Sequence, residues 1–214
     1  MICAYDKVYL EKACTALGRM LDFAVYELGY ELSSFFDMFL ASDIAERFAQ
    51  GDFTVLVGKS GVELAYEVLE QAGCGYKRSP ARFTTGRSEE YWTGWALAYY
   101  QWDTAMTFAE IVQCVPITEI CALYTPYHEM DIRQFVDKMN ELYRKVKPET
   151  NLKLMRRKAG LSQSELAELS GVPLRTIQQY EQRQKSINKA QVEYLMMLAG
   201  VLCCRVEELV EKVV

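Results

Sequence analysis

The chain has 214 residues, of which half are hydrophobic and a quarter are charged. This composition excludes an intrinsically disordered chain, and the length suffices for one large domain or two modest ones. No apolar run approaches the roughly 20 residues that cross a bilayer, which excludes a membrane-spanning protein. The first residues, MICAYDKVYLEK, place charges where a signal peptide needs an apolar stretch, so we expect a cytoplasmic protein with no membrane partner.

Charge is distributed unevenly along the chain. Residues 1–147 contain 14 lysines and arginines against 21 aspartates and glutamates, whereas residues 148–214 contain 10 against 8. Residues 150–189 are the most basic part, with 8 against 3. A basic module joined to an acidic one predicts that a polyanion binds at one end of the chain only.

Helical periodicity runs through almost the whole chain, because apolar residues recur at spacings of three and four. We therefore expect an all-α protein. The first predicted helices span residues 6–28, 32–40, 42–50 and 60–71. Ser60 and Glu63 form a capping-box pattern at the start of the last helix, where each side chain can satisfy a free backbone N–H group. The apolar, β-branched run 53–57 predicts a short extended segment.

A basic loop and then a highly aromatic stretch follow. Residues 73–87 contain glycines and Pro80, which predicts an exposed loop. A helix should begin at Ser88, and residues 91–102 contain six tyrosines and tryptophans. Either this is the central helix of its domain, or one aromatic face remains open for a partner. In the second case we expect the partner contacts to come from Tyr91, Trp92, Trp95, Tyr99 and Trp102.

The remainder of the first domain is also predicted to be helical. Thr107 and Glu110 form a second capping-box pattern, residues 118–123 predict a short helix, and residues 128–145 predict a final amphipathic helix. That helix should stop near Val146, because the residue before a proline disfavours the helical conformation. The sequence therefore predicts an N-terminal helical domain over residues 1–147 and a second domain over residues 148–214.

The second domain is predicted to contain five helices. Their expected ranges are 152–158, 162–169, 173–182, 188–198 and 206–212. Ser162 and Asn188 should cap the second and fourth helices, and Gly171 should make the turn between the second and the third. A small core should hold the angle between those two helices: Leu166, Val172, Ile177 and Leu198.

The pattern over about 60 residues of this domain resembles the helix-turn-helix of Cro/CI/Xre repressors. The residues that carry the resemblance are Leu161, Ser162, Gln163, Leu166, Ala167, Ser170, Gly171, Val172, Ile177 and Glu181. The resemblance implies a five-helix, lambda-repressor-like domain whose third helix enters the major groove of double-stranded operator DNA. Ala167 is small enough for the second and third helices to approach each other closely.

The resemblance also implies which residues meet the DNA. Those expected to face the bases are Leu174, Arg175, Thr176 and Gln179. Arg175 suits guanine O6 and N7, Gln179 suits adenine N6 and N7, and Leu174 suits a thymine methyl group. The expected phosphate contacts are Gln163, Gln178, Arg183 and Lys185. The alternative for each of these side chains is that it is only exposed to solvent and does not contact DNA.

The sequence departs from the family after Glu181. Gln182 and Arg183 stand where the family usually has Asn-Gly, and arginine tolerates a positive φ less well than glycine. We therefore expect a differently shaped turn there, with Arg183 replacing a lost backbone contact by a charged one. Because one such domain binds a half-site weakly, we also expect a homodimer.

No catalytic, metal or cofactor site is predicted. The only histidine, His128, begins a predicted helix and suits a cap or the surface, and Gly58-Lys59-Ser60 lacks the upstream glycine of a phosphate loop. The seven cysteines show no C-x-x-C spacing, so we expect reduced, buried thiols. We expect no enzyme activity.

The chain also resembles a group of bacterial two-domain Xre regulators that share the stretch Tyr91-Trp-Thr-Gly-Trp-Ala-Leu-Ala-Tyr-Tyr-Gln-Trp102. They resemble antitoxins encoded beside small toxin genes. This resemblance implies an antitoxin that holds a toxin protein through the acidic domain and represses its own operon through the basic one. The alternative is a repressor whose first domain senses a small molecule in an aromatic pocket.

Overall fold

Helices account for all the regular structure that the computed structural model describes, which covers residues 3–75, 86–147 and 149–212. The all-α prediction is therefore confirmed. The chain divides into two compact units, unit 1 over residues 1–143 and unit 2 over residues 144–214. None of the described helices is long and apolar enough to cross a membrane.

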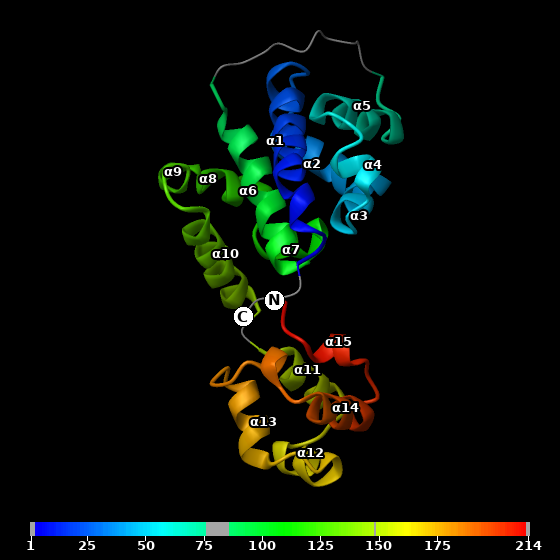
Figure 1. The fold of residues 1–214 in the computed structure, drawn as a ribbon, viewed down its shortest axis with the longest axis vertical. Helices are drawn as coiled ribbons and strands as arrows, with labels where there is room; N and C mark the ends of the chain where they lie inside the picture. Colours follow the sequence, from blue (N-terminus) through cyan, green and yellow to red (C-terminus); the bar gives the residue numbers. More distant parts are fainter. Residues whose placement is uncertain (1–2, 76–85, 148, 213–214) are drawn as a thin grey trace. The chain divides into compact units, whose positions relative to one another are not determined.

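The described residues of unit 1 form a short 3-10 helix and ten α-helices (Figure 1). Their bounds are η1 Lys7–Tyr9, α1 Leu10–Tyr26, α2 Leu32–Ala41, α3 Asp43–Ala49, α4 Phe53–Leu56, α5 Gly61–Gln71, α6 Glu89–Thr104, α7 Phe108–Cys114, α8 Ile117–Ala122, α9 Tyr124–Tyr127 and α10 Ile132–Val146, the last of which ends in unit 2. Both predicted capping boxes are present, at Ser60 with Glu63 and at Thr107 with Glu110. Most of the predicted loop 73–87 lies outside the described residues.

Helix α1 joins the other parts of unit 1, because it packs against α6 along one side and against α5 along another (Figure 1). Two glycines let α1 and α6 touch backbone to backbone. A Cβ atom added at Gly94 would lie 2.6 Å from the Leu17 carbonyl oxygen and 2.8 Å from the Gly18 Cα. A Cβ added at Gly18 would lie 2.7 Å from the Tyr91 carbonyl oxygen. The position of α6, and of the aromatic side chains that it carries, follows from this close contact.

Three local predictions for unit 1 need correction. Residues 53–56 form helix α4, and the extended segment predicted over residues 53–57 is absent. The Asp52 carboxylate accepts the Thr54 N–H and caps the first turn of this helix. The last amphipathic helix begins at Ile132 instead of residue 128, and the Asp131 carboxylate accepts the Arg133 N–H at its start. The first predicted helix is divided into η1 and α1.

The cysteines are all free thiols, although they are not all buried. Cys14 and Cys114 are buried, whereas Cys203 is exposed. Burial raises the pKa of the Cys14 thiol to about 12, so this group stays protonated at neutral pH. A packing role therefore fits Cys14 better than chemistry does.

We predict that Gly94→Ala destabilises the protein by about 1–3 kcal/mol, because the new methyl group overlaps the α1 backbone. Urea unfolding of the full chain, followed by circular dichroism, measures this. Gly200→Ala is the matched control, since Gly200 lies in helix α14 (Val192–Val201) of unit 2 with no atom within 4 Å of an added Cβ. Equal stability of the two variants would contradict the backbone contact.

Candidate DNA interface and aromatic pocket

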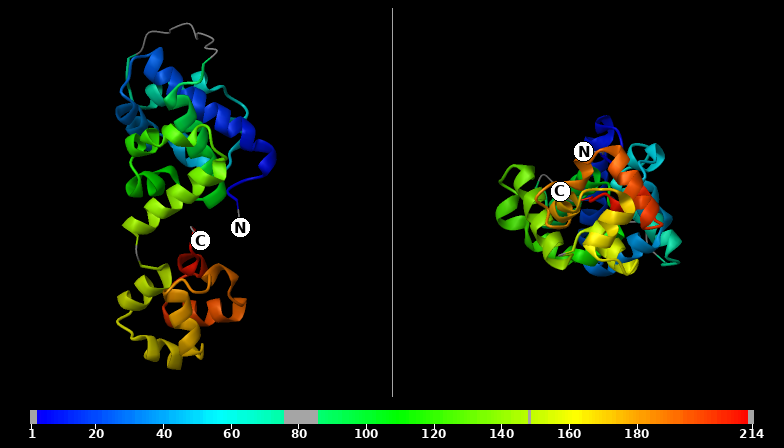
Figure 2. Two further views of the ribbon diagram at one scale, coloured as in Figure 1. Left: turned by 90° about the vertical axis from the view of Figure 1, so that its left-hand side faces the viewer. Right: turned by 90° about the horizontal axis from the view of Figure 1, so that it is seen from below.

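From residue 149 to residue 212, where the structure describes unit 2 without a gap, the chain forms five α-helices and a 3-10 helix (Figure 1). Their bounds are α11 Asn151–Lys158, α12 Gln163–Ser170, α13 Leu174–Glu181, η2 Ile187–Lys189, α14 Val192–Val201 and α15 Val206–Leu209. Helix α12 packs against both α13 and α14 (Figure 2). The four predicted core residues are confirmed as part of a larger buried cluster: Leu152, Leu166, Val172, Ile177, Tyr180, Ile187, Leu195, Leu198, Ala199, Leu202 and Leu209.

The corner between α12 and α13 forms as the sequence predicts. Ser162 caps α12, and Glu165 completes a capping box whose hydrogen bonds from the Ser162 N–H and hydroxyl lower the pKa of the Glu165 carboxyl. The helix ends at Gly171, which has a φ of +70°. That left-handed conformation is easily adopted only by glycine, and it turns the chain sharply into α13.

A buried ion pair fixes α13 against α11. The Arg156 guanidinium donates to both carboxylate oxygens of Glu181, with its Nε 2.6 Å from Oε1 and a terminal nitrogen 2.9 Å from Oε2. The side chains of these two residues are 11% and 2% exposed. The hydrogen bond to Glu181 raises the pKa of Arg156, which stays charged. Such a two-pronged pair holds both helices in one orientation.

The same network reaches α12 and the loop before it. The Gln163 side-chain amide donates to Glu181 Oε2 at 2.7 Å, and Arg156 also donates to the Leu161 carbonyl at 2.7 Å. Gln163 is thus a structural link between α12 and α13. Its predicted phosphate contact stays a prediction, and the second amide hydrogen is the donor that would make it.

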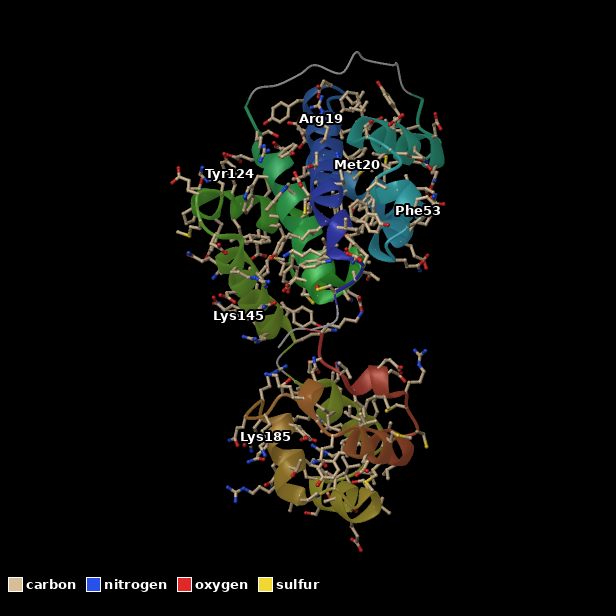
Figure 3. The ribbon with its side chains drawn as sticks, viewed as in Figure 1. Arg19, Met20, Phe53, Tyr124, Lys145 and Lys185 are labelled. Carbon is tan, nitrogen blue, oxygen red and sulfur yellow. The ribbon has the colours of Figure 1, made fainter. Side chains whose placement is uncertain are left out.

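The predicted base-contacting residues share helix α13 while its apolar side faces the core. Leu174 and Arg175 are exposed, Thr176 and Gln179 are half-buried, and Ile177 between them is fully buried. Of the predicted phosphate contacts, Gln178 is half-buried, whereas Arg183 and Lys185 are exposed. Lys185 lies just beyond the C-terminal end of α13 (Figure 3). The structure therefore places all of these residues on α13 and in the segment that follows it, whereas Gln163, the fourth predicted phosphate contact, lies on α12.

That turn differs from the expectation. Arg183 itself adopts a φ of +55°, so the left-handed conformation is kept although glycine is absent. The Arg183 guanidinium donates to the Lys147 carbonyl at 3.3 Å, which helps to offset the strain. Asn188 also differs, because it does not cap α14. Its side chain instead accepts the Glu211 N–H at 2.8 Å and thereby ties η2 to the residues after α15.

Comparison with known proteins decides the nature of this segment. A protein-family model described as Helix-turn-helix matches residues 152–208. These residues form a helix-turn-helix domain. The match supports sequence-specific DNA binding and the regulation of transcription. No curated protein and no solved structure matches the chain.

Unit 1 contains a second candidate site, an aromatic pocket with a volume of about 380 Å³. Three of its residues, Tyr91, Trp92 and Trp95, come from the first half of α6. The remaining lining residues lie just before α6, on α9 or between α9 and the start of α10: Arg87, Tyr124, Tyr127, His128, Met130 and Ile132. Of these residues, the sequence singles out only the aromatic side chains of α6, because no local spacing connects them to residues 124–132.

Helix α6 is a central helix that also keeps an outer aromatic side. Tyr100 is fully buried, whereas Tyr91, Trp92, Trp95 and Tyr99 are half-buried. The prediction that Trp102 contacts a partner is wrong, because this residue is only 6% exposed. Its indole N–H donates to the Tyr5 carbonyl at 2.8 Å, so Trp102 belongs to the core.

Neither site offers metal chemistry among the residues that the structure describes, where no group of three histidines, cysteines, aspartates or glutamates lies close enough to hold an ion. His128 lies at the C-cap of α9, with its ring stacked on Tyr124 at a centroid distance of 4.1 Å. Its Nδ1 lies 3.0 Å from the Tyr124 carbonyl oxygen, which can only accept. Nδ1 therefore carries a hydrogen in this arrangement.

We predict that Arg156→Ala destabilises unit 2 by about 3 kcal/mol or more, because it leaves the Glu181 carboxylate buried without its partner. The matched control is Arg157→Ala. Arg157 is 63% exposed in its ion pair with Glu149, and its loss should cost less than about 1 kcal/mol.

Two probes separate the units in this experiment. All three tryptophans lie in α6, so their fluorescence reports the unfolding of unit 1 alone, whereas circular dichroism reports both units. Arg156→Ala should lower the urea midpoint by circular dichroism and leave the fluorescence midpoint unchanged. If Arg156→Ala and Arg157→Ala unfolded alike by both probes, the ion pair would not be what fixes α13.

Proposed function

We propose that this protein is a dimeric transcriptional repressor that reads its operator with helix α13. The observation that carries the proposal is the combination of exposed Leu174 and Arg175 on α13 with the buried Arg156–Glu181 pair behind it. Exposed side chains on a rigidly held helix suit the reading of base edges in the major groove. A single domain of this size covers one half-site, so two copies related by a two-fold axis fit specific binding.

The charge distribution supports the same arrangement. Residues 150–189 contain 8 basic against 3 acidic residues, and residues 1–147 contain 14 against 21. DNA attracts the first segment and repels the second, so unit 1 should stay away from the phosphates. Unit 1 is thus free to bind something else.

Arg175→Ala should cost about 1–3 kcal/mol of binding free energy and relax the base preference at one position of each half-site. The target DNA is first isolated by selection from a random duplex library, and binding is then measured by fluorescence anisotropy. Lys185→Ala is the comparison variant, because it should weaken binding to all sequences about equally and reduce the salt slope by about 1. Wild-type preference and affinity in both variants would contradict the assignment of α13.

For unit 1 we propose the role of an antitoxin that holds a toxin protein on the outer aromatic side of α6. Tyr99 lies on that side, stacked on Trp95 at a centroid distance of 6.2 Å and close to the Arg133 guanidinium. Half-buried aromatic and arginine side chains are typical of protein interfaces. The resemblance to antitoxin-like regulators through residues 91–102 supports the same role.

Co-expression with the product of the adjacent gene tests the antitoxin role. The neighbour should be toxic alone, harmless with this chain, and should co-purify with it. Tyr99→Ala should weaken that capture at least tenfold, whereas Phe53→Ala, which removes an exposed ring from α4, should leave it unchanged. A harmless neighbour that does not co-purify would end the antitoxin proposal.

The aromatic pocket favours a second candidate for unit 1, a sensor domain that binds a small molecule. Its volume of about 380 Å³ falls within the range of ligand sites, roughly 300–1,000 Å³. Tyr99 does not line this pocket, so Tyr99→Ala separates the two candidates: it should weaken toxin capture but not ligand binding.

A further inference from the structure

We infer that the aromatic pocket of unit 1 binds a planar aromatic compound that carries an acidic group, with the ring held among Tyr91, Trp92 and Trp95 and the acid bound by Arg87. This inference deepens the sensor candidate for unit 1 and rests on it. It names the chemical class of the ligand, which that candidate leaves open.

The walls of the pocket are held in place from behind. Trp92 meets Tyr124 edge to face at a centroid distance of 5.7 Å and meets buried Phe135 in the same way at 5.3 Å. On the other side, Tyr124 and His128 are stacked with an interplanar angle of 14°. Because these rings already brace one another, a ligand would not have to order them on binding.

The pocket is also open enough to be entered. Its five tyrosine and tryptophan residues are all half-buried, and Met130 is 41% exposed. Aromatic side chains that only filled a core would be covered, as Tyr100 and Trp102 are on the same helix. A cluster of half-covered rings around a cavity keeps apolar surface in water, which is usual for a binding site.

The shape of the side chains favours a planar ligand. Of the residues that the structure describes, five tyrosines and tryptophans and one histidine line the cavity, and Met130 and Ile132 are the aliphatic ones among the lining. Aromatic rings pack on other rings in offset-stacked or edge-to-face arrangements, which gain about 0.5–1.5 kcal/mol beyond area burial. A flat ring system exploits these faces better than a branched aliphatic chain does.

The charge of the lining favours an acid over a base. The lining that the described residues form contains no carboxylate, whereas the Arg87 guanidinium lies over the Tyr91 ring, 5.1 Å from its centroid. An arginine can donate two parallel hydrogen bonds to a carboxylate, and it repels a cationic ligand. Among the described residues, the closest carboxylate to His128 is that of exposed Glu129, 3.6 Å from Nε2 and outside the lining.

Isothermal titration calorimetry of the full chain tests this with three probes that share one ring system. They are 2-naphthoate, the neutral 2-naphthylmethanol and the cationic 2-naphthylmethylammonium. We expect 2-naphthoate to bind most tightly, at least tenfold more tightly than the alcohol, and the cation to bind most weakly. No binding of 2-naphthoate, or tighter binding of the cation, would overturn the inference.

Variants separate the ring contacts from the charge contact. Arg87→Gln should weaken 2-naphthoate about tenfold and leave the alcohol unchanged, whereas Tyr127→Ala should weaken both probes. Arg205→Gln, at an exposed arginine of unit 2, is the matched control and should change neither. Unchanged 2-naphthoate affinity in Arg87→Gln would overturn the assignment of the acid to Arg87.

A DNA-binding measurement distinguishes this inference from the proposed function. The selected DNA is titrated with the chain in the presence and absence of saturating 2-naphthoate. A changed DNA affinity supports both the site and the sensor role. An unchanged DNA affinity, together with calorimetric binding of 2-naphthoate that is weakened about tenfold in Arg87→Gln, supports the site and overturns the sensor role.

Discussion

The buried pair between Arg156 and Glu181 is the interaction on which the account of unit 2 depends. It joins the first and third helices of the helix-turn-helix domain, and Gln163 extends it to the second. A charge pair this deeply buried contributes little net stability compared with apolar packing, but removing one partner is costly. Its value lies in geometry, because it favours one orientation of α13, which would give Arg175 one position against DNA in the function that we propose.

In unit 1 the position of a helix is fixed by a close contact between two backbones instead of an ion pair. Glycines at positions 18 and 94 bring the backbones of α1 and α6 into contact, which fixes the helix that carries the aromatic side chains. One side of α6 packs against α1, and the other faces α8, α9 and the pocket. Both units therefore present side chains from a helix that is held in place by packing on its opposite side: α13 in unit 2, which we propose to contact DNA, and α6 in unit 1, which we propose to contact an aromatic ligand or a protein partner.

The sequence predicts most helices and the DNA-binding corner, because caps, turn glycines and apolar spacing are local signals. Ser60, Thr107 and Ser162 cap helices as expected, and Gly171 makes its turn. Some errors concern local caps, at Asp52 and Asp131, and others come from tertiary contacts. Asn188 bonds to Glu211 instead of capping α14, and Trp102 is covered through its contact with Tyr5. The pocket joins α6 to residues about thirty positions later, which no periodicity reveals.

The most direct test of the central claim is dimethyl sulfate protection on the selected DNA. This reagent methylates guanine N7 in the major groove and adenine N3 in the minor groove, so it reports which groove α13 enters. We predict protected guanine N7 atoms in two half-sites about 10 base pairs, or one helical turn, apart. Protection of adenine N3 alone, or unprotected guanines throughout a bound site, would contradict it.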